Sequence, residues 1–155
     1  MNIVRRSFLK LAGSVGALAA VGAAGLLRSA GAWAAWNKAG FESKAFADAL
    51  KNLGVANPVE SRDIAITAPD IAENGAVVPV SVTTTLADVT SISFLVSENP
   101  VALVASYKIP AGTLPSVANR IKMAKTSNVV VVVEAGGKLY SATKEVKVTV
   151  GGCGG

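Results

Sequence analysis

The spacing of hydrophobic residues along the chain changes from a helical period to an alternating one. In residues 38–53 the apolar positions recur at i, i+3, i+4 and i+7, which places them on one face of a helix. These positions are Phe46, Ala49, Leu50 and Leu53. Gly54 follows where the C-terminal glycine of a helix is expected. The pattern predicts one amphipathic helix that docks on the rest of the domain.

From residue 62 onward, apolar and polar residues alternate, as they do in half-buried strands. The predicted strands cover residues 64–67, 78–86, 92–96, 103–107, 117–123, 129–133 and 138–150. Pro79 marks either an edge strand or the first residues of its strand, because proline cannot donate to the ladder. About seven short strands without intervening helices predict an all-β fold, an immunoglobulin-like antiparallel β-sandwich with one N-terminal helix.

The strand at residues 129–133 consists of five consecutive valines and allows two interpretations. A central strand that is buried on both faces has this composition. A strand whose outer face lies under a partner subunit has the same composition, because large exposed apolar patches mark interfaces. The sequence does not separate the two.

The first 34 residues have the organisation of an export signal. Arg5 and Arg6 form a twin-arginine motif, an uncharged run follows at residues 11–27, and Ala32-Trp33-Ala34 has the small-x-small pattern of a cleavage site. The alternative is a membrane anchor, but 17 residues containing four glycines are short and weakly apolar for a span. We expect a cleaved signal at residues 1–34, export in the folded state to the periplasm, and no membrane attachment afterwards.

Removal of the signal changes the charge balance. Four of the 15 basic residues and none of the ten acidic ones precede residue 35, so the net charge falls from +5 to +1. Without a basic cluster, the body at residues 35–150 lacks a nucleic-acid-binding footprint. The chain also contains no histidine, the commonest metal ligand and general base. We therefore expect no metal, no cofactor and no catalytic residues of its own.

The only cysteine of the chain, Cys153, lies among four glycines at residues 151–155. Because glycine is conformationally permissive, Gly151, Gly152, Gly154 and Gly155 predict a flexible arm with a thiol near its tip. An unpaired cysteine in an exported protein is either a reactive thiol or half of an intermolecular disulfide. The residues themselves leave three classes open: a covalent carrier, a disulfide-linked interaction protein, and a plain binding sandwich that does not need Cys153.

The sequence Gly-Gly-Cys-Gly-Gly resembles the swinging arm of the SoxY family, the sulfur-carrier subunits of thiosulfate oxidation. Three further segments resemble core strands of that family, and a twin-arginine signal is also typical of it. These segments cover residues 71–80, 121–129 and 137–148. The resemblance extends over essentially the whole chain after the signal.

The resemblance implies that pathway intermediates are held covalently on Cys153, first as an S-thiosulfonate and then as a persulfide. It implies a heterodimer with a SoxZ-like subunit. A haem enzyme would attach thiosulfate-derived sulfur, a hydrolase would release sulfate, and in some organisms a sulfane dehydrogenase would oxidise the remaining sulfur. This chain would then be a carrier and not an enzyme. The alternative is an exported sandwich linked through an intermolecular Cys153 disulfide.

Two lysines precede the arm on the last predicted strand. Lys144 and Lys147 could steer an anionic cargo toward Cys153. The simpler interpretation is a solvated strand face, because exposed charges on a strand need no further role.

Overall fold

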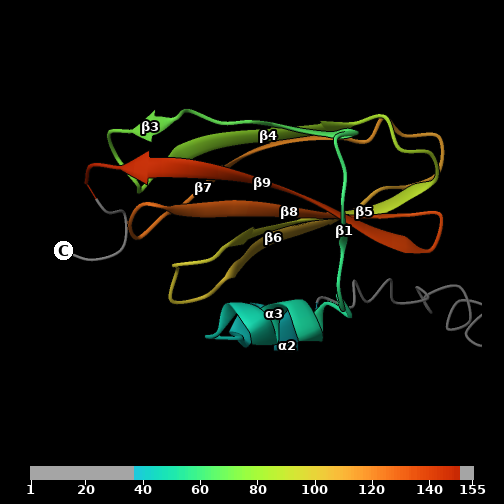
Figure 1. Ribbon diagram of the computed structural model, residues 1–155, viewed down its shortest axis with the longest axis horizontal. Coiled ribbons are helices and arrows are strands. Elements are labelled where there is room, and N and C mark those ends of the chain that lie inside the picture. Colours follow the sequence, from blue (N-terminus) through green and yellow to red (C-terminus); the bar gives the residue numbers. More distant parts are fainter. Residues whose placement is uncertain (1–36, 151–155) are drawn as a thin grey trace, which may run out of the picture. The chain divides into compact units, whose positions relative to one another are not determined.

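The computed structural model describes residues 37–150, which form two short helices and nine strands (Figure 1). The predicted signal and the five-residue arm lie outside the described residues. The helices are α2 (Lys38–Glu42) and α3 (Phe46–Asn52). The strands are β1 (Val59–Glu60), β2 (Ile64–Thr67), β3 (Ile71–Ala72), β4 (Val78–Thr84), β5 (Val89–Val96), β6 (Leu103–Lys108), β7 (Ser116–Ile121), β8 (Ser127–Ala135) and β9 (Lys138–Val148).

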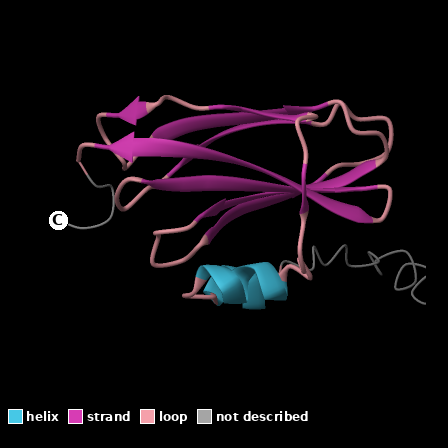
Figure 2. Ribbon diagram, viewed as in Figure 1, coloured by secondary structure: helices cyan, strands magenta, loops and turns pink. Residues whose placement is uncertain are grey.

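The strands form two sheets that face each other (Figure 2). The larger sheet has the order β1-β9-β8-β5-β6, with β3 also pairing with β9, and the smaller sheet has the order β2-β4-β7. All pairings among the seven longer strands are antiparallel, whereas β1 and β3 lie parallel to β9. The prediction of an all-β sandwich with about seven strands is confirmed, since β1 and β3 have only two residues each.

Alternate residues of the facing strands fill the space between the sheets. Phe94 and Ile92 of β5 have fully buried side chains, and so, to within 2%, do Val78, Val80, Val82, Val129, Val131 and Val133 of β4 and β8. Burying one such side chain contributes about 1.5–3 kcal/mol. The main core comprises Ile64, Ala72, Val78, Val80, Val82, Ile92, Phe94, Val96, Ile121, Met123, Val129, Val131, Val133, Ala135 and Val146.

The five valines lie on β8, a central strand between β9 and β5. Val129, Val131 and Val133 are fully buried between the sheets. Val130 and Val132 point to the other face of the sheet, where they join a second cluster with the helices. Of the two interpretations, the structure supports the central strand that is buried on both faces.

The single helix predicted over residues 38–53 is two helices, and this part of the prediction is wrong. The chain is not helical between Glu42 and Phe46, because Ser43 and Ala45 adopt extended backbone conformations. Ser43, at the break, is hydrogen-bonded to both helices. The side-chain amide of Asn52 in α3 donates to Ser43 Oγ at 2.8 Å, and the Ser43 hydroxyl donates to Ala39 O in α2 at 2.7 Å. Polar contacts replace the missing helical turn.

The predicted apolar face of the helix is correct. Phe46, Ala49, Leu50 and Leu53 all belong to the second cluster, which also contains Leu95, Leu103 and Val132 from the larger sheet. Gly54 has a φ of +74°, and the amide of Val55 donates to Leu50 O at 2.9 Å, as in a Schellman C-terminal motif. The two helices thus cover the outer face of the larger sheet (Figure 2).

Pro79 is the second residue of β4, a central strand, so it marks the first residues of its strand and not an edge. The Thr84 amide donates to Pro115 O at 3.3 Å, so the even-numbered residues of β4 direct their backbone groups to β7. The odd-numbered residues face β2, which ends at Thr67. Pro79 lies past that end and therefore leaves no ladder bond unmade.

Candidate functional site: the attachment of the C-terminal arm

The residues that were predicted to carry the function lie outside the described part of the chain. This applies to Cys153, to Gly151, Gly152, Gly154 and Gly155, and to Arg5 and Arg6. The described part of the site is the end of β9 with Thr149 and Val150, the residues that precede the arm in the sequence.

Near its C-terminal end, one edge of β9 is bonded to β8 and to Thr126, the residue that precedes β8. The ladder between the two strands runs from Lys138 to Val146. Beyond it, the amide of Val148 donates to Thr126 Oγ1 at 2.9 Å. The threonine hydroxyl therefore continues the ladder after the backbone pairing with β8 has ended.

The other side of β9 is held by residues 70–75, which include β3. The amide of Lys147 donates to Asp70 O at 2.9 Å, and the amide of Thr149 donates to Ala72 O at 3.1 Å. The Thr149 hydroxyl donates to Glu73 O at 2.9 Å. These bonds extend the pairing past the last residue of the strand itself.

Gly75 connects Val150, the last described residue, to the core of the sandwich. Its amide donates to Val150 O at 2.7 Å, and its carbonyl accepts from the amide of Met123 at 2.7 Å. The Met123 side chain is fully buried in the main core. Asn74 shapes this turn, because its Oδ1 accepts from the amide of Ala76 at 2.8 Å. We call residues 70–75, Met123, Thr126 and 147–150 the arm root.

The arm root fixes the chain up to the carbonyl of Val150, the last described residue. A backbone hydrogen bond contributes about 0.5–1.5 kcal/mol net, and residues 147–150 make several of them. From the Val150 Cα, the three residues to Cys153 can span about 10 Å when extended. The chain is therefore fixed to within three residues of Cys153 in the sequence.

Charge at the arm root is mixed. Lys144 Nζ lies 3.0 Å from Asp70 Oδ1, so this lysine is engaged in an ion pair. Lys147 is exposed on the opposite face of β9 and forms no ion pair within the described residues, while Glu73 is exposed nearby. Because Lys144 is paired with Asp70, Lys147 is the better candidate of the two lysines for steering an anion, and this role stays a prediction.

Among residues 37–150, no group of three or more His, Cys, Asp or Glu residues could hold a metal ion. None of the helices in this part of the chain is long and apolar enough to cross a membrane.

Sequence reasoning predicted the arm but missed the residues that hold the chain just before it. The bonds at the arm root are mostly backbone bonds, which leave no mark on the residue types that make them. The one available signal was the Asn74-Gly75 dipeptide, which is typical of a tight turn.

The fold and the arm root together define a class of protein: a β-sandwich scaffold whose last strand is anchored on both sides and continues into a glycine-flanked cysteine. The model of a family described as "Sulfur oxidation protein SoxY" matches residues 50–153, about two thirds of the chain and including Cys153. The chain belongs to the SoxY family.

One solved structure gives the same result. The sulfur carrier protein SoxY from Chlorobium limicola f thiosulfatophilum is 48% identical, with a TM-score of 0.61, over 67% of this chain and 96% of that one. Superoxide reductase (neelaredoxin) from Ignicoccus hospitalis is 19% identical, with a TM-score of 0.49, over 56% of this chain and 80% of that one, a likeness too low to carry any argument. No curated protein matches the chain.

Proposed function

We propose that this protein is a sulfur carrier that holds intermediates of thiosulfate oxidation covalently on Cys153. The observation that carries the proposal is the match to the SoxY family through residue 153, together with 48% identity to a solved sulfur carrier protein. The arm root supports it, because a carrier needs a fixed scaffold from which a short arm extends. The glycines support it as well, because flanking residues without side chains let a thiol enter narrow active sites.

The proposed chemistry needs no catalytic group on this chain. Oxidative joining of the Cys153 thiol to the outer sulfur of thiosulfate forms an S–S bond, releases one proton and passes two electrons to a haem enzyme. Hydrolysis of the resulting S-thiosulfonate consumes one water, releases sulfate and a proton, and leaves a persulfide on Cys153. Where a sulfane dehydrogenase is present, it oxidises the outer sulfur further. Each step is catalysed by the enzyme that receives the arm.

The proposed setting is the periplasm. Arg5 and Arg6 form the twin-arginine motif that would route the folded chain there, with residues 1–34 removed. A SoxZ-like subunit is the proposed partner in a heterodimer. The alternative is an exported interaction protein linked through an intermolecular Cys153 disulfide, since a single cysteine is compatible with either function.

The test is whether Cys153 is needed for thiosulfate oxidation. In a strain that lacks this gene, the wild-type chain should restore thiosulfate consumption and the Cys153→Ser variant should not. Immunoblots of the periplasmic fraction control for equal export of the two chains. Full consumption with the serine variant would overturn the carrier proposal and would favour a plain binding sandwich.

A further inference from the structure

One side of the sandwich is open, between the edge strands β6 and β7. In the described part of the chain β6 pairs only with β5, and β7 pairs only with β4. A groove of about 430 Å³ lies between them and is lined by both strands. Its walls are mostly apolar, with Val101, Val104 and Ala105 on one side and Ile121 on the other.

The backbone of β7 is free to receive another strand. Because Val117, Asn119 and Ile121 bond to β4, the amides and carbonyls of Ala118 and Arg120 point away from the sheet. Proteins usually protect such an edge, since bare backbone groups pair readily with another chain. Here Ala118 and Arg120 are exposed, and no segment among residues 37–150 covers them.

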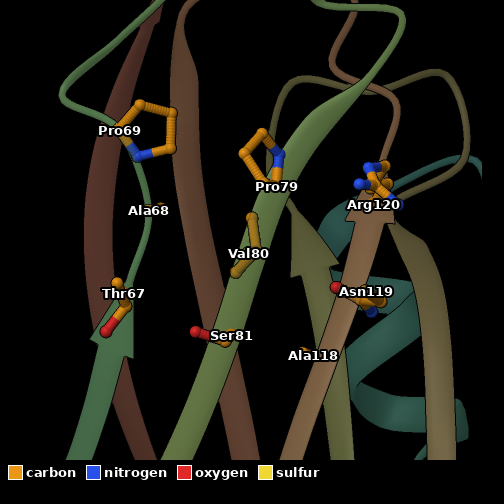
Figure 3. A pocket seen from close by; sticks show the side chains of 9 residues that line it. All are labelled: Thr67, Ala68, Pro69, Pro79, Val80, Ser81, Ala118, Asn119 and Arg120. Carbon is orange, nitrogen blue, oxygen red and sulfur yellow. The ribbon is translucent and has the colours of Figure 1, made fainter.

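A second hollow lies on the other side of β7. It measures about 670 Å³ and crosses the outer face of the smaller sheet, where no helix packs. Thr67, Ser81 and Ala118 form one row across it, and Pro69, Pro79 and Arg120 form the next (Figure 3). Asn119 and Arg120 line both hollows, so a strand added beside β7 would have space for its side chains on either face.

A polar group inside the groove also lacks a partner. The Asn119 Nδ2 donates to Tyr107 Oη at 3.4 Å, which links β7 to β6. The Asn119 Oδ1 is buried and accepts no hydrogen bond from any described residue. A buried acceptor without a partner is destabilising, and a donor from an inserted segment would recover part of this loss.

The charge around the groove is of one sign. Arg120 and Lys122 line it, Lys108 ends β6, and these three residues form no ion pair with another described residue. Neither residues 103–108 nor residues 116–122 include an aspartate or glutamate. Two copies that met through these edges would bring no acidic group to the basic rim. The complement is a segment of another protein that carries acidic side chains.

We propose that an extended, acidic segment of the partner subunit adds a strand along β7 and fills the open side of the sandwich. β-strand addition of this kind takes affinity from backbone bonds and specificity from the flanking hollows. The position relates it to the arm: β7 leads through Lys122 to Met123, whose amide bonds to Gly75, which in turn bonds to Val150. A partner strand at β7 therefore lies beside the arm root. This inference rests on the partner assignment made in the proposed function.

The test is the affinity of the full exported chain for the SoxZ-like subunit of the same organism, measured by calorimetry. Ala118→Pro removes an outward amide but no internal bond, whereas Ala118→Thr keeps that amide. The proline variant should bind at least about tenfold more weakly, since loss of one or two backbone bonds costs about 1.4 kcal/mol. The threonine variant should stay within about threefold of wild type, because it retains the backbone bond.

A second pair of variants tests the charge, and does not depend on how well the fold tolerates the Ala118→Pro substitution. Arg120→Glu should weaken binding and reverse the effect of added salt. Lys138→Glu, at the start of β9 and in the lining of neither hollow, should do neither. Hydrogen exchange in the wild-type complex should protect the amides of Ala118 and Arg120 and change little at Val117 and Asn119, which already bond to β4.

The outcomes separate this inference from the proposed function. Wild-type affinity in both Ala118→Pro and Arg120→Glu overturns the β7 site but leaves the carrier and its partner in place. If the wild-type chain does not bind the subunit, or if the variants abolish a homodimer instead, both the SoxZ-like partner and the β7 site are overturned. Sulfur loading on Cys153 is measured independently of all these results.

Discussion

The arm root and the open side lie next to each other, but they differ in backbone hydrogen bonding. At the arm root, both edges of β9 are bonded as far as Val150, by Thr126 on one side and by residues 70–75 on the other. On the open side, β7 presents Ala118 and Arg120 with unpaired backbone groups and hollows on both faces. The contrast indicates that the first region is built to hold its position and the second to receive another chain.

The largest expected difference between the two regions is in the stability of variants at two adjacent residues, Met123 and Lys122. Met123→Ala should lower the free energy of unfolding by about 2–5 kcal/mol, because its fully buried side chain fills the core beneath the arm root. The exposed neighbour Lys122 belongs to the groove, and Lys122→Ala should change stability by no more than about 0.5 kcal/mol. Urea denaturation measures both.

The affinities of the same two variants for the partner subunit should show the reverse contrast. Lys122→Ala should weaken binding, while Met123→Ala, assayed well below its unfolding midpoint, should bind with little change. Equal losses of stability in the two variants would show that the root and the groove are not separate regions.

Thr126 tests the arm root by a smaller amount. Thr126→Val keeps the shape of the side chain but removes the acceptor for the Val148 amide, and should cost about 1–2 kcal/mol. Thr126→Ser retains the hydroxyl and should stay within about 0.5 kcal/mol of wild type. Hydrogen exchange at the Val148 amide should accelerate only in the valine variant. Identical exchange in both variants would mean that the threonine does not anchor the strand.

The ion pair between Lys144 and Asp70 should have the smallest effect. The Asp70 side chain is 90% exposed, so Asp70→Asn should lower stability by less than about 1 kcal/mol. The bond that matters to the arm root, from the Lys147 amide to Asp70 O, belongs to the backbone and remains in the variant. A larger loss in thermal denaturation, removed by added salt, would show that charge and not the backbone holds residues 70–75 against β9.

The long strands could be predicted because their side chains alternate over many residues. β4 shows this most clearly, because Val78, Val80 and Val82 are buried while Pro79 between them is exposed. β1 and β3 could not be predicted, since two residues show no period and both strands form only by pairing with β9, more than 70 residues away in sequence. The helix break was hidden for a related reason, because the bonds from Ser43 and Asn52 that stabilise it are tertiary.

Part of the candidate site could also be predicted from the sequence, and part of it could not. Cys153 could be predicted from composition, as the one thiol of a chain without histidine, placed among glycines. The bonds of Gly75 to Val150 and Met123 could not, because they are backbone bonds between three distant segments. The open side was also invisible, since a bare edge is a property of sheet order and not of any residue in β7.

The most direct test of the central claim is the intact mass of this protein purified from cells that oxidise thiosulfate. The account predicts species heavier by one sulfur atom, and by one sulfur atom plus one SO₃ group, that disappear with a thiol reductant and are absent from Cys153→Ser. A population of unmodified chains or of Cys153-linked homodimers without such adducts would contradict it. So would the same adducts on the serine variant.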